Sequence, residues 1–110
     1  MGSNAGRSIP EFDYFERRSL KQSMSTEHAL DALDALSNGA RLKIFRTLVR
    51  HEPEGLTAGV LTDLMEMRHN TLSNHLSVLS RAGLICGTRE GRFIRYRACL
   101  EGMRALLGFL

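Results

Sequence analysis

The feature that most constrains this fold is a change in the spacing of apolar residues at Leu84. Before that residue, apolar side chains recur every three or four positions, as on one face of a helix. From Leu84 to Ala98 they alternate around Glu90-Gly91, a compact hairpin turn signal, and after Cys99 the helical spacing returns. At 110 residues the chain fits one domain. The order predicts a mainly α fold with a small β-hairpin, α-α-α-α-β-β-α.

Polar residues mark the expected helix boundaries. The residues placed to cap the four helices are Ser25 or Thr26, then Asn38, Thr57 and Asn70. Pro53 and Gly55 end the second helix, and Gly83 ends the fourth. The third helix is expected to face inward with Val60, Leu61, Leu64 and Met65. These signals predict four helices of ordinary length before the hairpin.

The first 23 residues differ from the rest because they lack periodic apolar residues. We interpret residues 1–23 as an amino-terminal extension that includes added, non-native sequence, with Met24 as the native start. Within it, the segment FDYFERRSLKQS is compatible with a short helix bearing the aromatic cluster Phe12, Tyr14 and Phe15. Residues 24–110 form the predicted domain.

Charge is distributed unevenly along the chain. Residues 26–66 carry seven acidic and four basic side chains, a net charge of −3. Residues 67–97 carry six arginines against Glu90 alone, a net charge of +5. The planar guanidinium fork suits phosphate and guanine. The second segment therefore favours an anionic partner, although a solvated basic face is the simpler alternative.

The fourth predicted helix has one polar side and one apolar side. At 100° per residue, Leu72, Leu76, Leu79 and Ala82 lie opposite the polar and basic positions 70, 73, 74, 77 and 81. A helix that enters the major groove needs this layout, although many surface helices share it. The residues predicted to bind DNA from this helix and the preceding turn are Arg68, His69, Asn70, Thr71, Ser73, Asn74 and Ser77.

The hairpin is predicted to carry cations at its tip. Alternation places Ile94, Tyr96 and Ala98 on one face and Phe93, Arg95 and Arg97 on the other. Arg89 and Arg92 flank the tip, where two cations can straddle a phosphate backbone or enter a minor groove. The alternative is an edge hairpin that charge protects from aggregation. Since the fourth predicted helix, with its polar side, directly precedes the hairpin in the sequence, we predict DNA contact for Arg89 and Arg92.

Residues 28–110 resemble the ArsR family of bacterial winged-helix repressors. The matching segments are ALDALSNGARLKIFRTLVRHEPEGLTAGVLTDLM, HNTLSNHLSVLSRAGLICGTREGRFIRYRA and LEGMRALLGFL. The stretch NTLSNHLSVLSRAGLI, followed by an R-x-G-R-x-I-x-Y wing, is the most specific part. The resemblance implies a homodimer that binds a palindromic operator on double-stranded DNA. It also implies that an inducer weakens this binding and derepresses an operon.

The inducer implied by the resemblance is arsenite, another thiophilic metal or a redox signal. The family's Cys-x-Cys arsenite pattern has no counterpart in the third helix, and the last helix has Glu101 but no histidine for the family's zinc pattern. A further family pattern places cysteines on a tail after the last helix, beyond Leu110. If such a tail carries the sensor, this chain is expected to bind DNA and ignore arsenite.

The two cysteines of the chain, Cys86 and Cys99, are weak candidates for metal ligands. A turn centred on Glu90-Gly91 places Cys86 opposite Arg95, which separates the two thiols by roughly 7–13 Å along the strands. That distance is too long for a disulfide. With no secretory signal in the sequence, both are expected to be reduced thiols of a cytoplasmic protein.

The first and last helices carry apolar stripes that a core of this size is not expected to cover. A stripe of this kind usually marks an interface, although a helix lying across its own core is the alternative. The residues predicted to form a two-fold dimer interface are Leu30, Leu33, Leu100, Met103, Leu106, Leu107 and Leu110.

These observations predict a dimeric, sequence-specific DNA-binding repressor. The alternative is a winged-helix protein-interaction module without sequence-specific DNA binding. An enzyme is disfavoured because no nucleophile–base pair, phosphate loop or metal triad stands out. A membrane protein is disfavoured because no apolar run approaches the about 18 residues of a membrane span.

Overall fold

The computed structural model describes residues 24–110 as five helices and one small sheet. The elements are α2 (Thr26–Leu36), α3 (Gly39–Arg50), β2 (Leu56–Thr57), α4 (Ala58–Met65), α5 (His69–Arg81), β3 (Ile85–Glu90), β4 (Phe93–Ala98) and α6 (Leu100–Phe109). The expected helix and aromatic cluster in the extension lie outside the described residues. Among the described helices, none is long and apolar enough to cross a membrane.

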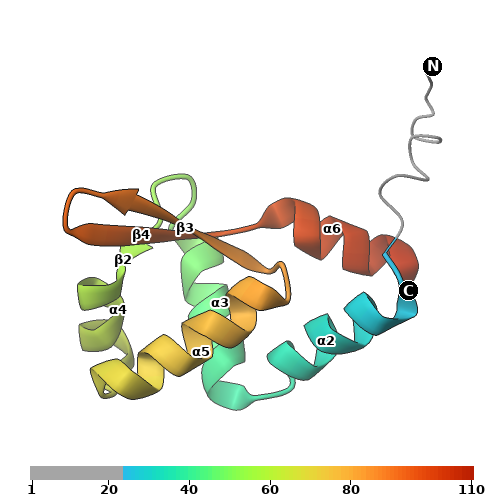
Figure 1. Cartoon of the computed structure of the whole chain (residues 1–110), viewed down its shortest axis with the longest axis horizontal. Helices are drawn as coiled ribbons and strands as arrows, with labels where there is room; N and C mark the ends of the chain where they lie inside the picture. The colour runs from blue at the N-terminus through green and yellow to red at the C-terminus, as the bar shows by residue number, and fades with distance from the viewer. Residues whose placement is uncertain (1–23) are drawn as a thin grey trace.

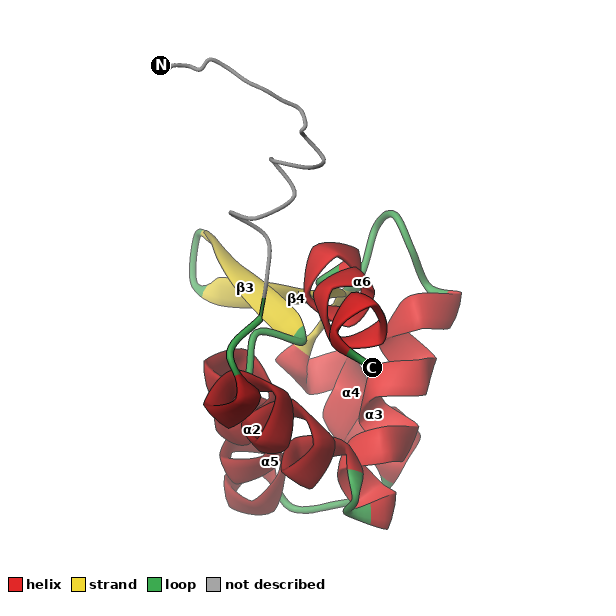
Figure 2. Cartoon of the chain, turned by 90° about the vertical axis from the view of Figure 1, so that its right-hand side faces the viewer, coloured by secondary structure: helices red, strands yellow, loops and turns green. Residues whose placement is uncertain are grey.

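The helices and the sheet are arranged around one apolar core (Figure 1). α3 packs against α5, α2 and strand β4, while α6 lies over α2 (Figure 2). The fully buried large side chains are Ile44, Leu48, Leu61, Leu72, Leu79 and Leu84. The predicted fold class, mainly α with a β-hairpin, is confirmed.

Three of the predicted helix caps are confirmed. Ser25 accepts a hydrogen bond from the amide of His28, and Asn38 accepts one from the amide of Arg41. Thr57 Oγ1 accepts from the amide of Val60 at 3.4 Å. Each side chain satisfies an amide that the helix itself leaves unpaired.

The predicted start of α5 is wrong by two residues. The helix begins at His69, its N-cap is Arg68, and no side chain makes a cap hydrogen bond there. Asn70 was expected to cap this helix, but it lies within the first turn and is exposed. Since Glu66 takes a left-handed conformation with φ 54°, the chain reverses sharply before Arg68 and the helix starts early.

The predicted inward face of α4 is half right. Leu61 is fully buried and Met65 is half-buried, but Val60 and Leu64 are exposed. α4 is only 8 residues long and packs mainly on α5 and the sheet. It therefore buries one line of side chains, whereas the sequence pattern suggested a broader stripe.

The sheet contains a third strand, β2, that the spacing of apolar residues does not predict. β2 pairs antiparallel with β4, with Leu56 opposite Tyr96 and Thr57 opposite Arg95, so the strand order is β2-β4-β3. The two residues of β2 are too few to show alternation in a sequence. The Glu52 carboxylate adds a tether by accepting a 3.1 Å hydrogen bond from the amide of Ala98.

Gly55 allows the chain to reach this strand. Its φ is +74°, and a Cβ at this position would meet the carbonyl oxygen of Tyr96 and lie 2.7 Å from Cγ of Arg97. Gly83 has a similar φ of +78°, but a Cβ there would meet nothing within 4 Å. The two glycines share a backbone conformation and differ in their surroundings.

This difference predicts unequal costs for Gly55→Ala and Gly83→Ala. Gly83→Ala carries only the cost of a left-handed residue, about 1–2 kcal/mol in the free energy of unfolding. Gly55→Ala also pushes β2 away from β4, and we expect it to cost at least about 2 kcal/mol more. Urea denaturation of both variants measures the difference, and equal losses would contradict this role of Gly55.

Candidate nucleic-acid interface

The exposed face of α5 is polar along its whole length. The predicted DNA-binding residues of this helix and its N-cap, Arg68, His69, Asn70, Thr71, Ser73, Asn74 and Ser77, are all exposed. On the opposite side, Leu72, Leu76 and Leu79 are buried. α5 thus presents short donors and acceptors to solvent while its leucines anchor it to the core.

The amino-terminal end of α5 leaves backbone amides available. The amides of a helix's first turn have no partners within the helix, and Arg68 supplies no side-chain cap. These amides and the positive end of the helix dipole favour a phosphate group. Because Arg68 and His69 are exposed beside them, this end of the helix can receive an anion.

Ser77 holds a neighbouring arginine on this face. Its Oγ accepts a 2.8 Å hydrogen bond from Nη1 of Arg81, one turn further along α5. Ser77 was predicted to contact DNA itself. The bond shows that its hydroxyl also orients Arg81, whose guanidinium retains further donors.

The hairpin of β3 and β4 turns one residue later than predicted. Glu90 pairs with Phe93, so the turn consists of Gly91 and Arg92, and Gly91 takes a φ of +63°. The sequence placed the turn at Glu90-Gly91. Arg89 and Arg92 remain exposed at the tip, and Nη1 of Arg89 donates to the carbonyl of Gly91 at 3.3 Å.

One arginine of the hairpin is paired with an acid. Nε of Arg95 donates to both carboxylate oxygens of Glu90, at 3.0 and 3.1 Å. It is the one ion pair within residues 24–110. Strand alternation alone did not reveal it, because it joins residues on the two arms across the turn. The pair lowers the net positive charge of the hairpin beside Arg89 and Arg92.

The α5 end and the hairpin tip lie on the same side of the molecule. In Figure 1 both reach the left-hand end, with α4 between them, and in Figure 2 both lie on the left. α4 contacts both α5 and the strands β2 and β4. The start of α5 and the arginine-bearing tip of the hairpin are therefore brought to one side of the molecule.

The strand partner of Cys86 differs from the one predicted. Cys86 lies opposite Arg97, not Arg95, because the turn is shifted. The amide of Cys99 donates to the carbonyl of Leu84 at 2.7 Å, so the two cysteines occupy diagonal positions of the strand pair. Such positions are about 7–8 Å apart. Within residues 24–110, no group of three His, Cys, Asp or Glu side chains could hold a metal ion.

The terminal helices expose most of the apolar side chains predicted for a dimer interface. Leu30, Leu33, Leu100, Leu107 and Leu110 are exposed, and Met103 is half-buried. Leu106 is the correction: it is only 3% exposed and belongs to the chain's own core. The exposed residues lie on α2 and α6, which contact one another at the end opposite the hairpin tip (Figure 1).

Comparisons with known proteins agree with this arrangement. Residues 36–85 match a family described as a helix-turn-helix domain. The chain is 37% identical over 93 residues to the HTH-type transcriptional regulator YbzH of Bacillus subtilis, which covers 74% of this chain and 93% of that protein. An ArsR-like transcriptional regulator from Rhodococcus sp. RHA1 superimposes with a TM-score of 0.67 at 26% identity over 74% of each chain.

A second solved structure shares the fold and has a known assembly. It is the homodimeric winged helix-turn-helix DNA-binding domain Mb0332 of Mycobacterium bovis. It matches with a TM-score of 0.61 at 26% identity, over 96% of this chain and 82% of that one. These proteins are transcriptional regulators, not enzymes. The chain belongs to the ArsR family of winged helix-turn-helix, DNA-binding transcriptional regulators.

Proposed function

We propose that this regulator is a dimeric repressor that binds a palindromic operator and leaves it when an inducer binds. The observation that carries the proposal is the exposed polar face of α5 beside the arginine-tipped hairpin, on one side of the molecule. Since the target is DNA, the proposed site of action is the cytoplasm.

Base reading is assigned to the amino-terminal half of α5. Asn70, Ser73 and Asn74 are exposed there, and an asparagine amide matches the donor and acceptor that adenine presents in the major groove. Ser77 lies on the same face further along the helix, and Thr71 lies at its border. Short side chains let the helix backbone approach the bases closely.

Phosphate binding is assigned to the residues around this helix. Arg68 and His69 lie at its start, next to the free amides, and Arg89 and Arg92 lie at the hairpin tip. Contacts of this kind set the position of a protein on the duplex and carry no sequence information. They make the affinity strongly dependent on salt.

Dimerisation is assigned to the exposed apolar side chains of α2 and α6. Leu30 and Leu107 are 60% and 63% exposed, and an apolar surface of this kind marks an interface. The homodimeric relative supports the same assembly. A two-fold axis at this end sets two α5 helices about one DNA turn, ~34 Å, apart, which matches a palindrome.

The proposed inducer is arsenite, another thiophilic metal or a redox signal. Cys86 is exposed and Cys99 is half-buried, and these are the two thiols of the chain. A redox signal has access to Cys86 on the hairpin. Cys86 and Arg89 are three residues apart on strand β3. Oxidation or metal binding at this thiol can therefore shift the strand and move Arg89, a proposed DNA contact.

The direct test is selection of bound fragments from a genomic library at moderate salt. We expect enrichment of a palindrome whose half-sites are centred about 10 base pairs apart. Transcription from a promoter that carries the selected sequence should fall when the protein is added. Binding without any preferred sequence would instead favour a protein-interaction module that uses the exposed α2 and α6 surface.

Removing the hairpin cations with Arg89→Ala and Arg92→Ala tests the phosphate contacts. Loss of two phosphate contacts in each subunit, four per dimer, should flatten the slope of log affinity against log salt by about 4. The loss of affinity should be similar for operator and random DNA. Arg104→Ala, an exposed arginine on α6, is the matched control and should leave the slope unchanged. Equal slopes for all three proteins would exclude hairpin contact with the phosphates.

Asn74→Ala tests base reading separately. We expect it to weaken discrimination at one base pair in each half-site by about 1–3 kcal/mol while the salt slope stays the same. Competition binding with single-base operator variants measures this effect. A uniform loss over all sequences, accompanied by a flatter slope, would place Asn74 on the phosphate backbone instead.

A further inference from the structure

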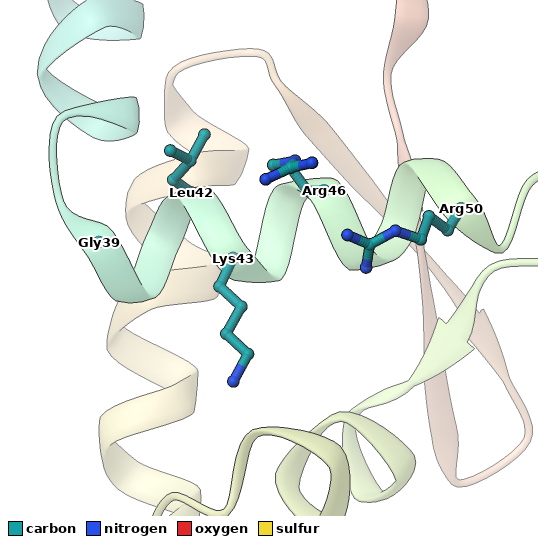
Figure 3. A pocket seen from close by; sticks show the side chains of 5 residues that line it. All are labelled: Gly39, Leu42, Lys43, Arg46 and Arg50. Atoms are coloured by element: carbon teal, nitrogen blue, oxygen red, sulfur yellow. The ribbon is translucent and has the colours of Figure 1, made fainter.

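The outer side of α3 carries a row of cations that the proposed DNA contacts do not use. Lys43, Arg46 and Arg50 are exposed and line a hollow of about 340 Å³ together with Gly39 and Leu42 (Figure 3). At 100° per residue the three cations fall within about 60° of one another. Within residues 24–110, none of them forms an ion pair.

This basic row faces away from the surface assigned to DNA. Ile44 and Leu48 of α3 are buried in the core that they share with Leu72 and Leu76 of α5. Because α3 and α5 pack against each other through these residues, their exposed sides point in opposite directions. In Figure 2, α5 and the hairpin tip lie on the left, and α3 lies on the right. A duplex on α5 and the hairpin therefore leaves the basic row uncovered.

An acidic row of matching length lies on α2. Glu27, Asp31 and Asp34 are exposed and also fall within about 60° of one another. Leu30 and Leu33, assigned to the dimer interface, lie on one side of this row, and the core-facing alanines lie opposite it. In residues 24–110 these three acids have no ion-pair partner.

The two rows match in spacing when the helices run antiparallel. Lys43, Arg46 and Arg50 are separated by three and then four residues. Asp34, Asp31 and Glu27, taken in the reverse direction, are separated by three and then four as well. At a rise of 1.5 Å per residue, both rows have steps of about 4.5 and 6 Å. Each cation can therefore face one acid along the whole row.

The surroundings of the basic row favour a protein partner over a second duplex. Leu42 and Val49 lie along one edge of the row and are 40% and 39% exposed. Apolar side chains gain nothing from a phosphate backbone, but they gain from burial against another helix. Ion pairs at the edge of a partly desolvated protein–protein contact are also screened less by salt than isolated ion pairs on the surface.

We propose that the basic row of α3 binds the acidic row of α2 from a second copy of this chain, with the helices antiparallel. The contact joins two different surfaces, so it is heterologous and links one proposed dimer to the next. It leaves α5 and the hairpin of every copy free. Neighbouring dimers on DNA can therefore use it to bind cooperatively.

Sedimentation velocity of the full chain, without DNA and at about 50 mM and 500 mM salt, tests the contact. At low salt we expect a concentration-dependent species larger than the dimer, which high salt removes. The variants Lys43→Glu/Arg46→Glu and Asp31→Lys/Asp34→Lys should each raise its dissociation constant at least about tenfold. The two variants mixed in equal amounts should associate again, because the unmodified row of each variant meets the unmodified row of the other, and the two reversed rows also complement each other.

Matched controls separate this contact from general charge effects and from misfolding. Glu54→Lys/Asp63→Lys reverses two exposed acids elsewhere and should associate like the unmodified chain. Of the four substitutions in the two rows, Asp34→Lys places a cation in the last turn of α2, where it suits the helix dipole. Circular dichroism of both variants should confirm intact helices.

Two outcomes would overturn the proposal. One is the absence of salt-sensitive association in the unmodified chain, or of its recovery in the mixture. The other is a loss of operator affinity in Lys43→Glu/Arg46→Glu alone, with association unchanged, which would assign the row to DNA. Since association is measured without DNA, a failure of the proposed repressor function gives a different result: sequence-independent DNA binding with association intact.

Discussion

Strand β4 is the constraint on which the proposed DNA-binding surface depends. It pairs with β3 to form the hairpin and with β2 to connect that hairpin to the start of α4. The Glu52 carboxylate and the close approach of Gly55 fix the chain at the same strand. α4 in turn contacts α5. The hairpin tip and α5 therefore keep one relative position. Two elements that bind the same duplex need such a fixed position, because the grooves of DNA have a fixed spacing.

The helices could be predicted from the sequence because their signals are local. Caps at Ser25, Asn38 and Thr57 lie next to the helices they start, and the leucines of α5 repeat at helical spacing. The start of α5 could not be predicted, because it depends on the left-handed Glu66, a conformation that the residue type does not favour. Its polar face was nevertheless identified correctly, since a two-residue error at the start does not rotate the helix.

Several features that sequence patterns missed depend on how distant residues pack or on the exact geometry of a turn. β2 is a strand only because Leu56 and Thr57 pair with β4, and two residues are too few to show the alternation that predicts a strand. The hairpin turns one residue later than the sequence predicts. The residue opposite Cys86 is therefore Arg97 and not Arg95. Leu106 looked like the other leucines of α6, and only the packing of that helix separates it from Leu107.

The distribution of charge separates two kinds of contact on one small domain. The hairpin tip with its arginines and the start of α5 lie on the same side of the molecule, and Glu90 pairs with Arg95 of the hairpin. An acid in this position lowers the positive charge of the hairpin, and so weakens its attraction to any duplex, whatever the sequence. The rows on α2 and α3 instead complement each other, and they lie outside this surface. A modest net charge of +3 thus conceals surfaces with separate partners.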